Sequence, residues 1–472
     1  MAKAKKSEAT LTLEEKLEQA LIADEEQPYK APDNWCWVEL QLLCSIPITD
    51  GTHKTPKYCD ADNGIPFISA KDVTGQYINW ENIKYITMEL HEELHKRLAP
   101  QINDILLAKN GTTGVAAIVD TEKIFDIYVT LAILRINSNI AVPKYVLHLI
   151  NSPICKIQFD EHLTGIGVPN LHLRDIKVTQ IPFPPLAEQQ RIVDRIERLY
   201  AKLDEVKENV QNVIDSFENR KSAILHKAFN GKLTAKWREE NHIDRELWES
   251  KSIADLFTHT TGKALKKDNK EGILHKYITT SNLYWGMFDF TEVRKMYFTD
   301  REIDKCTAKK GDLLICNGGD VGRAAIWDYD YDICLQNHIS KLRKKQDNLE
   351  VRFFFYYFML SKLKGNINSK GIGISSLSAK DLLAMSVKLP TLQEQIEIVR
   401  ILDNILLKQQ QAKEKAEDVL EKIELIKKSI LARAFRGELG TNNPDEESSI
   451  ELLKTVLSED KDEKTISKPE SK

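Results

Sequence analysis

The sequence lacks the segments that send a chain into or across a membrane. No apolar run approaches the roughly 18 residues that a membrane-spanning helix requires. The lysine-containing N-terminus is not followed by an apolar segment with a small-residue cleavage site. The seven cysteines include no Cys-x-x-Cys pair. We therefore expect a cytoplasmic protein with reduced, buried thiols and no zinc site.

Familiar catalytic motifs are missing as well. The sequence has no Gly-x-Ser-x-Gly elbow, no His-Glu-x-x-His pair and no Asn-Pro-Pro-aromatic tetrapeptide of the kind that amino-methyltransferases use. Its eleven histidines are scattered along the chain. These absences predict a protein that is not an enzyme, with no catalytic residue, no metal ligand and no cofactor of its own.

Positive charge is not in excess. The formal net charge is −4, whereas a nucleic-acid-binding domain is typically basic. Residues 441–472 carry five basic and nine acidic side chains (5 − 9 = −4), so this tail accounts for the whole net charge. Basic clusters remain at Lys263–Lys270, Lys309–Lys310 and Lys341–Lys345. Such clusters are more often solvated surface than phosphate contacts.

The sequence does contain a long internal repeat. The run that starts at Leu163, LTGIGVPNLHLRDI, returns from Ser369 as SKGIGISSLSAKDL, 206 positions later (369 − 163). The same offset relates Leu186-Ala-Glu-Gln to Leu392-Gln-Glu-Gln. Stacked arrays repeat every 20 to 50 residues or so, whereas each of these copies is large enough to form its own core. The repeat therefore predicts a pseudo-twofold molecule with two similar surfaces.

Two long helices are expected, one in each copy. From Ile192 to Phe217 the apolar residues alternate in steps of four and three, and the same spacing runs from Ile398 to Ile430. This is the seam of a coiled coil, and a helix-ending glycine follows each seam, at Gly231 and Gly437. Because the globular segment between the helices must return the chain to its start, we expect an antiparallel pair.

The fold class expected is α+β. Short β-like runs at 65–68, 105–107, 115–119 and 128–134 and a helix near 143–150 predict mixed structure in the first globular segment. Thr12 and Glu15 form a capping-box pattern at the start of a short helix. The expected segments are an N-terminal arm (1–30), a globular domain (31–185), a spacer helix (186–231), a second globular domain (232–391), a second spacer helix (392–438) and an acidic tail (439–472).

A strand, a glycine turn and a second strand occur in both copies, at Asp104–Ile118 and Asp312–Ile326. One interpretation is a plain hairpin whose glycines supply positive φ. The alternative is that the glycines let the backbone approach a phosphate group while polar side chains face a nucleic acid. These candidate side chains are Lys109, Asn110, Thr112 and Thr113 in the first copy and Asn317 and Arg323 in the second.

Further polar candidates lie nearby in each copy. Gln336-Asn337-His338 is a triplet that could read adenine or guanine edges, since side-chain amides pair bidentately with bases, or could bond at a strand end. Asn170 in the first copy and Ser375 and Ser376 in the second follow the repeated Gly-Ile-Gly. These three residues are candidates for DNA contact or for capping a short helix.

Four stretches resemble type I restriction-modification specificity subunits. The runs Gly165–Val193 and Lys428–Leu439 are similar to the helical junctions of that family, and Gln27–Trp37 and Lys232–Asn241 are similar to the entries of its two recognition domains. The resemblance spans residues 27–455. It is specific in the helical regions and loose between them, at about 38–160 and 250–365.

This resemblance implies two α/β target-recognition domains in pseudo-twofold arrangement, joined by two long antiparallel coiled-coil helices. Each domain would read one half of a bipartite site in double-stranded DNA. Catalysis would belong to the partners: two modification subunits that use S-adenosylmethionine to methylate adenine, and translocating nuclease subunits that use ATP and magnesium. The alternatives are a self-sufficient DNA modification enzyme, which the missing motifs disfavour, and a coiled-coil structural assembly protein.

Overall fold

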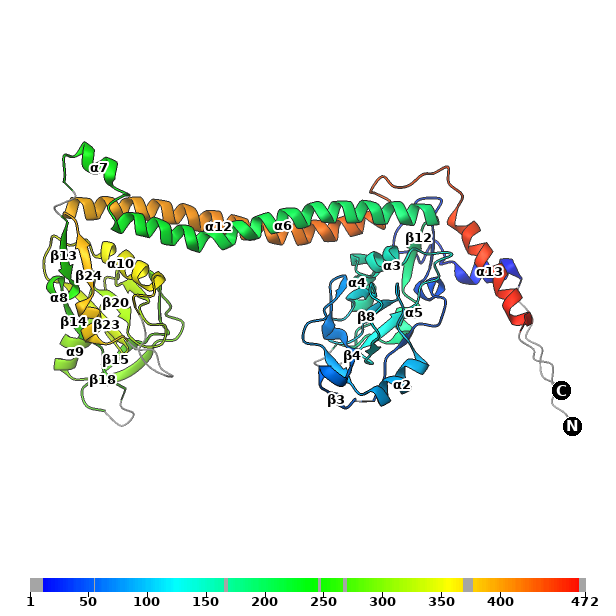
Figure 1. The fold of residues 1–472 in the computed structure, drawn as a ribbon, viewed down its shortest axis with the longest axis horizontal. Helices are drawn as coiled ribbons and strands as arrows, with labels where there is room; N and C mark the ends of the chain where they lie inside the picture. The colour runs from blue at the N-terminus through cyan, green and yellow to red at the C-terminus, as the bar shows by residue number, and fades with distance from the viewer. Residues whose placement is uncertain are drawn as a thin grey trace. The chain divides into compact units, whose positions relative to one another are not determined.

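The computed structural model describes residues 12–54, 56–164, 169–244, 248–265, 270–367 and 377–466. The chain forms two compact units (Figure 1), and each combines strands and helices as expected. Unit 1 comprises Met1–Glu208 and Leu420–Lys472, and unit 2 comprises Asn209–Val419. The repeated Gly165, Gly167, Gly371 and Gly373 lie outside the described residues.

Unit 1 contains two four-stranded sheets. A two-stranded sheet, named the frame here, joins the two ends of the globular module. One four-stranded sheet has the order β2-β11-β8-β9 (Thr49–Asp50, Leu131–Leu134, Ile105–Ala108, Ala116–Ile118), and the other has the order β10-β4-β7-β3 (Asp126–Ile127, Ile65–Ile68, Lys84–Ile86, Tyr58–Cys59). The frame is β1 (Cys36–Glu39) paired antiparallel with β12 (Gln180–Phe183). Strands β8 and β11 are buried along their whole length, so the apolar runs of the sequence form the centre of this unit.

Unit 2 repeats this arrangement, except that the outer strand of its second sheet pairs with a different neighbour. Its sheets have the orders β14-β23-β20-β21 (Phe257–Thr261, Ile339–Lys344, Leu313–Cys316, Ala324–Ile326) and β18-β15-β22-β19 (Arg294–Phe298, Ile273–Ile278, Ile333–Leu335, Thr307–Ala308). The frame is β13 (Glu249–Ser252) paired with β24 (Ser386–Leu389). In each unit the frame joins the first strand to the strand just before a long helix, so the two ends of each globular module meet at one place.

The short helices follow the sequence signals. In unit 1 they are α1 (Leu13–Ala20), α2 (Met88–Arg97), α3 (Pro143–Ile150), α4 (Pro153–Glu161), α5 (Leu173–Lys177) and α13 (Ser449–Ile466). In unit 2 they are α7 (Ala235–Glu240), α8 (Ile253–Leu256), α9 (Asp300–Cys306), α10 (Val351–Leu363) and α11 (Ala379–Ala384). The capping box of Thr12 and Glu15 is confirmed at the start of α1, and α1 packs against α13.

Two long helices, α6 (Leu186–Phe229) and α12 (Leu392–Ala434), occupy the ranges that the seams predict. In unit 1 Lys207 Nζ lies 2.7 Å from Glu424 Oε1, and Tyr200 donates to the carbonyl of Lys427 at 3.2 Å. In unit 2 Phe217 lines the same cavity as Leu406, and Leu225 packs in one core with Leu402. Later residues of α6 thus lie beside earlier residues of α12, which confirms the antiparallel pairing.

The seam is buried only where other elements cover it. Ile192 and Ile196 at the start of α6 are fully buried, because the globular module packs on them. Val206 and Val213 in the middle of α6 remain 45% and 42% exposed. Two helices alone cannot enclose both sides of a seam, so part of the apolar stripe stays open to a further partner. No described helix is long and apolar enough to span a membrane.

Candidate nucleic-acid interface

Both glycine turns are β-hairpins, as the plain interpretation predicts. β8 pairs antiparallel with β9, and β20 pairs antiparallel with β21. The glycines Gly111 and Gly114 in unit 1 and Gly319 and Gly322 in unit 2 all have φ between 68° and 87°, a region that favours glycine. The hairpins hold the candidate side chains on short, well-defined turns.

In unit 1 the turn is tied to the segment that precedes α5. The side-chain amide of Asn110 donates to the side-chain oxygen of Asn170 at 2.9 Å, and the amide of Leu171 donates to the carbonyl of Lys109 at 2.9 Å. Thr112 is exposed and donates to the carbonyl of Ala70 at 3.2 Å. The fold therefore places Asn170 beside the turn that carries Asn110 and Thr112, although Asn170 is far from them in the sequence.

Lys109 points into the protein. Its Nζ lies 2.5 Å from Asp50 Oδ2, and both side chains are only 8% exposed. A buried cation paired with a buried carboxylate has little charge left for a phosphate group. Thr113 bonds within the turn, to the carbonyl of Gly111 at 3.3 Å. Lys109 thus ties β8 to β2, while its neighbours on the turn face outward.

In unit 2 the turn is anchored in an equivalent way by different residues. The amide of Leu377 donates to the carbonyl of Asn317 at 2.9 Å, and the Asn317 side chain donates to Ser340 Oγ at 3.2 Å. Arg323 Nη2 donates to the carbonyl of Thr280 at 2.5 Å, and the guanidinium lies over the ring of Tyr284, 4.9 Å from its centroid. Arg323 is mostly enclosed, with 17% of its side chain exposed. Ser375 and Ser376 lie outside the described residues.

The triplet Gln336-Asn337-His338 is held by its backbone. The amide of Gln336 donates to the carbonyl of Ile278 at 3.0 Å, and the amide of Asn317 donates to the carbonyl of His338 at 3.0 Å. His338 is exposed, and its ring packs against Gly318, where an added Cβ would come within 2.9 Å of Nδ1. The triplet therefore presents side chains from a fixed backbone beside the glycine turn.

A second loop beside each turn was not identified from the sequence. In unit 1 Asp72 Oδ2 accepts from the amide of Ser69 at 2.8 Å. In unit 2 Asn282 Oδ1 accepts from the amide of Thr279 at 2.9 Å. A carbonyl of each loop accepts a hydrogen bond from a side chain of the turn, from Thr112 in unit 1 and from Arg323 in unit 2. The common pattern Ile-Ser/Thr-x-x-Asp/Asn at 68–72 and 278–282 is the signal that could have revealed it.

Most of the basic clusters are engaged inside the protein. Lys263 Nζ lies 2.6 Å from Glu302, Lys341 is buried against two backbone carbonyls, and Arg343 forms a bidentate pair with Asp312. The Asp312 pair raises the pKa of Arg343, while burial lowers the pKa of Lys341. Lys266 and Lys267 lie outside the described residues. The paired members of these clusters therefore have less positive charge available for a phosphate group.

The repeated Glu-Gln at the start of each long helix fastens the module to the helix. Gln189 accepts from the amide of Val142, and Gln395 accepts from the amide of Glu350, both at 2.9 Å. Glu188 accepts from the indole of Trp35 at 2.8 Å. In unit 2 Glu394 accepts from Trp248 at the same distance. The sequence repeat of these residues thus has a structural cause.

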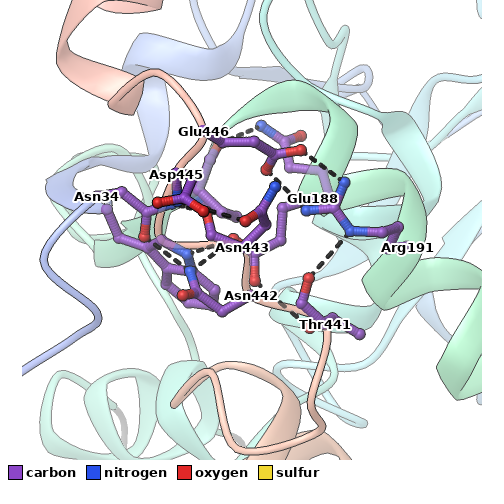
Figure 2. Close-up of polar contacts among 11 residues, drawn as sticks. Asn34, Glu188, Arg191, Thr441, Asn442, Asn443, Asp445 and Glu446 are labelled. Atoms are coloured by element: carbon purple, nitrogen blue, oxygen red, sulfur yellow. Dashed lines mark hydrogen bonds and ion pairs between the residues drawn. The ribbon is translucent and has the colours of Figure 1, made fainter.

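Figure 2 shows how the segment after α12 completes this anchor in unit 1. Asn442 donates to Glu188 at 3.0 Å, and Arg191 forms a bidentate pair with Glu446 at 2.8 and 2.7 Å. Burial raises the pKa of Glu188, whereas the hydrogen bond from Arg191 lowers the pKa of Glu446. In unit 2 the segment after α6 supplies Thr234 and Arg238 to Glu394 instead, at 2.7 and 2.5 Å.

The sequence of the chain is similar to those of known proteins. A family model described as "Type I restriction modification DNA specificity domain" matches residues 32–216 and again residues 245–422, together more than half of the chain. The chain is 23% identical to the EcoKI specificity subunit of Escherichia coli (strain K12), over 91% of this chain and 96% of the relative. It is 23% identical to the StySPI specificity subunit of Salmonella potsdam, over 93% of this chain and 97% of the relative.

Two solved structures share the fold. One, described as "Structural basis underlying complex assembly and conformational transition of the type I R-M system", has a TM-score of 0.65 at 21% identity and covers 87% of this chain and 100% of its own. The HsdS subunit from Thermoanaerobacter tengcongensis has a TM-score of 0.57 at 21% identity and covers 88% of this chain and 99% of its own.

Proposed function

The chain belongs to the family of type I restriction-modification DNA specificity proteins, and from that premise we propose that each unit reads one half of a bipartite DNA target. In this role the chain directs adenine methylation or restriction that its partner subunits carry out. The observation that carries the proposal is the pair of modules with one framework and different outward residues. The framework residues Glu188 and Glu394 are equivalent, whereas the exposed Thr112 of unit 1 is replaced by the exposed Asp320 in the equivalent turn of unit 2.

For unit 2 we propose that the face at the glycine turn contacts DNA through Gln336, Asn337 and His338. Their backbone is fixed by three strands, and among the described residues the Gln336 side chain has no hydrogen-bond partner. Amide side chains held in this way suit bidentate pairing with a base edge. Ser375 and Ser376, which lie outside the described residues, are kept as candidate DNA contacts on the sequence alone.

For unit 1 we propose that Asn110, Thr112, Thr113 and Asn170 form the corresponding face. Asn110 and Asn170 already bond to each other, so their remaining donors and acceptors are oriented before DNA arrives. Lys109 acts in this proposal as a positioning residue, because Asp50 neutralises it. Asn317 and Arg323 have the same supporting role in unit 2, where they bond to the backbone or side chains of neighbouring loops.

We further propose that this chain is not itself catalytic. Two modification subunits would supply S-adenosylmethionine chemistry, and nuclease subunits would supply ATP-driven and magnesium-dependent steps. We propose that the modification subunits dock on apolar side chains that the long helices leave exposed, at Val206, Leu425 and Ile426 within unit 1 and at Val213 and Leu407 within unit 2. The purified chain alone, mixed with S-adenosylmethionine and duplex DNA, should transfer no methyl group.

Module exchange tests the proposal. Glu39 and Gln180 are registered partners of the frame in unit 1, and Ser252 and Ser386 are the corresponding pair in unit 2. Replacing residues 40–179 with the equivalent segment of a relative keeps this frame, Trp35 and Glu188. Methylome sequencing should then show one changed half-site and one unchanged half-site. The matched exchange of residues 253–385 should change the other half. A change in both halves, or in neither, would contradict the two-reader proposal.

A further inference from the structure

Two histidines and an aspartate meet in unit 1, away from the glycine turn. His91 and His95 lie one turn apart on α2, and Asp126 lies on β10. His91 Nδ1 is 2.7 Å from Asp126 Oδ2, and His95 Nδ1 is 3.5 Å from Asp126 Oδ1. The two imidazole centroids are 4.7 Å apart. The histidines are scattered along the sequence, but the fold brings these two onto one carboxylate.

Two buried atoms of the cluster lack a hydrogen bond. Asp126 Oδ1 and His95 Nδ1 face each other at an ion-pair distance of 3.5 Å, and neither forms a hydrogen bond within the part of the chain that the structure describes. Only 2% of the Asp126 side chain is exposed. A buried carboxylate oxygen that accepts no hydrogen bond is costly in a folded protein, and such an atom calls for an explanation such as a bound ion. Both unsatisfied atoms belong to the same cluster.

The backbone holds these three side chains firmly. The side chain of Thr87 caps α2 by accepting from the amide of Leu90 at 3.4 Å, and the i, i+4 spacing places both histidines on one face of that helix. β10 runs parallel to β4, with Asp126 opposite Phe67. One donor atom from each of His91, His95 and Asp126 lies within 4.8 Å of the others. Binding of one ion would require the imidazoles to rotate so that the three donors converge on it.

We propose that His91, His95 and Asp126 bind one divalent transition-metal ion. Two imidazoles and a carboxylate suit zinc, cobalt, nickel or copper, whereas magnesium and calcium prefer sets of oxygen ligands. Three protein ligands leave a position for water, and the 34% exposure of His95 gives the ion a route from solvent. The ion clamps α2 to the sheet, and this role does not depend on the proposed DNA function.

Unit 2 shows that the fold itself does not require this cluster. Asp126 pairs with Phe67 as Cys334 pairs with Tyr277, and His91 follows its helix cap as Ile303 does. At this position unit 2 has an apolar core made of Tyr277, Met296, Phe298, Cys306 and Cys334, with Ile303 packed on it. Apolar packing therefore occupies the position of the cluster there, beside the Lys263–Glu302 ion pair that also holds α9. The polar set in unit 1 is a feature of that unit and not of the framework.

Zinc and cobalt binding to the full chain tests the site. After treatment with a chelator and dialysis, calorimetric titration should show one zinc ion bound per chain. Cobalt should give the ligand-field absorption of a four- or five-coordinate site, and zinc should raise the melting temperature. Because a lost second-shell partner already weakens metal binding by about 10 to 100-fold, His95→Gln and Asp126→Asn should each weaken binding by at least about tenfold.

The matched control is His53→Gln. His53 is also beside an aspartate, with Nε2 3.3 Å from Asp50 Oδ1, but it is 70% exposed and should be irrelevant to the site. Absence of one-to-one zinc and cobalt binding would overturn the proposal. Binding that survives both His95→Gln and Asp126→Asn, or that is lost in His53→Gln, would also overturn it. His95 lies at the edge of the cluster, so His95→Gln keeps the test decisive even if Asp126→Asn fails to fold by circular dichroism.

Discussion

An equivalent buried glutamate anchors the long helix in each unit, but its hydrogen-bond partners differ between units 1 and 2. Glu394 in unit 2 faces a buried guanidinium, with Arg238 Nη1 at 2.5 Å. Glu188 in unit 1 accepts from the neutral donors Trp35, Thr441 and Asn442, while the nearby Arg191 pairs with Glu446. In both units the glutamate accepts a hydrogen bond from a tryptophan. In unit 2 Glu394 also forms an ion pair with Arg238, for which Glu188 in unit 1 has no counterpart.

The largest expected effect comes from removing that acceptor charge. Glu394→Gln leaves the buried Arg238 without a counterion and should lower the free energy of unfolding of unit 2 by about 3–5 kcal/mol. Glu188→Gln, its matched partner, should lower that of unit 1 by only about 1 kcal/mol, since it weakens hydrogen bonds without stranding a charge. Urea denaturation with hydrogen exchange resolved by unit measures both. Equal losses would show that the two anchors are energetically alike.

A smaller effect is expected at the glycine turns. Lys109→Met leaves the buried Asp50 carboxylate without its lysine and should destabilise unit 1 by about 2–3 kcal/mol. Asn317→Ala, at the equivalent position, removes neutral hydrogen bonds and should cost about 1 kcal/mol. Denaturation of both variants gives the comparison.

The salt dependence of DNA binding tests whether Lys109 only positions the turn or contacts a phosphate group directly. If Lys109 only positions the turn, Lys109→Met leaves the slope of affinity against salt concentration unchanged. A slope lower by about one unit would show a direct phosphate contact instead. Arg174→Met is a suitable control, because Arg174 lies on the same unit and is 79% exposed.

The features that the sequence predicts well are those decided by neighbouring residues. The long helices, the capping box at Thr12 and the two hairpins follow from spacing and from glycine conformation, which are local properties. The partners of Lys109, of Glu188 and of His91 lie 59, 153 and 35 positions away. No spacing rule connects such residues, so Lys109 resembles a phosphate ligand in sequence and is an internal ion pair in the fold.

The proposed readers sharpen the comparison of the two modules. Gln336→Ala and Asn337→Ala should each reduce discrimination between the correct and an altered base by about 1–3 kcal/mol, in one half-site only. Asn110→Ala, on the proposed face of unit 1, should affect only the other half-site. Competition binding with single-base variants of the target measures both. Uniform weakening on all sequences would identify phosphate contacts.

The smallest predicted effect is a difference between the two units in how their stability depends on pH. His148 on α3 is buried, and burial lowers its pKa to about 4, while Glu197 raises it and Lys144 lowers it further. Tyr356 holds the equivalent place on α10, since Val142 and Glu350 bond to the paired glutamines at the same point before each helix. Burial raises the pKa of Tyr356, so this position in unit 2 does not titrate in acid.

Because the folded pKa of His148 lies below its ordinary value of 6.5, its contribution to stability is present above pH 6.5 and is lost as the pH falls toward 4. Between pH 7 and pH 5.5 unit 1 should lose about 1 kcal/mol from this group. His148→Gln removes the titrating ring and should flatten that part of the profile, whereas His162→Gln, an exposed histidine on the same unit, should leave it unchanged. Hydrogen exchange at both pH values reports each unit separately. If unit 2 weakened as much as unit 1 over this range, or if His148→Gln kept the full slope, the acid sensitivity would come from groups other than His148.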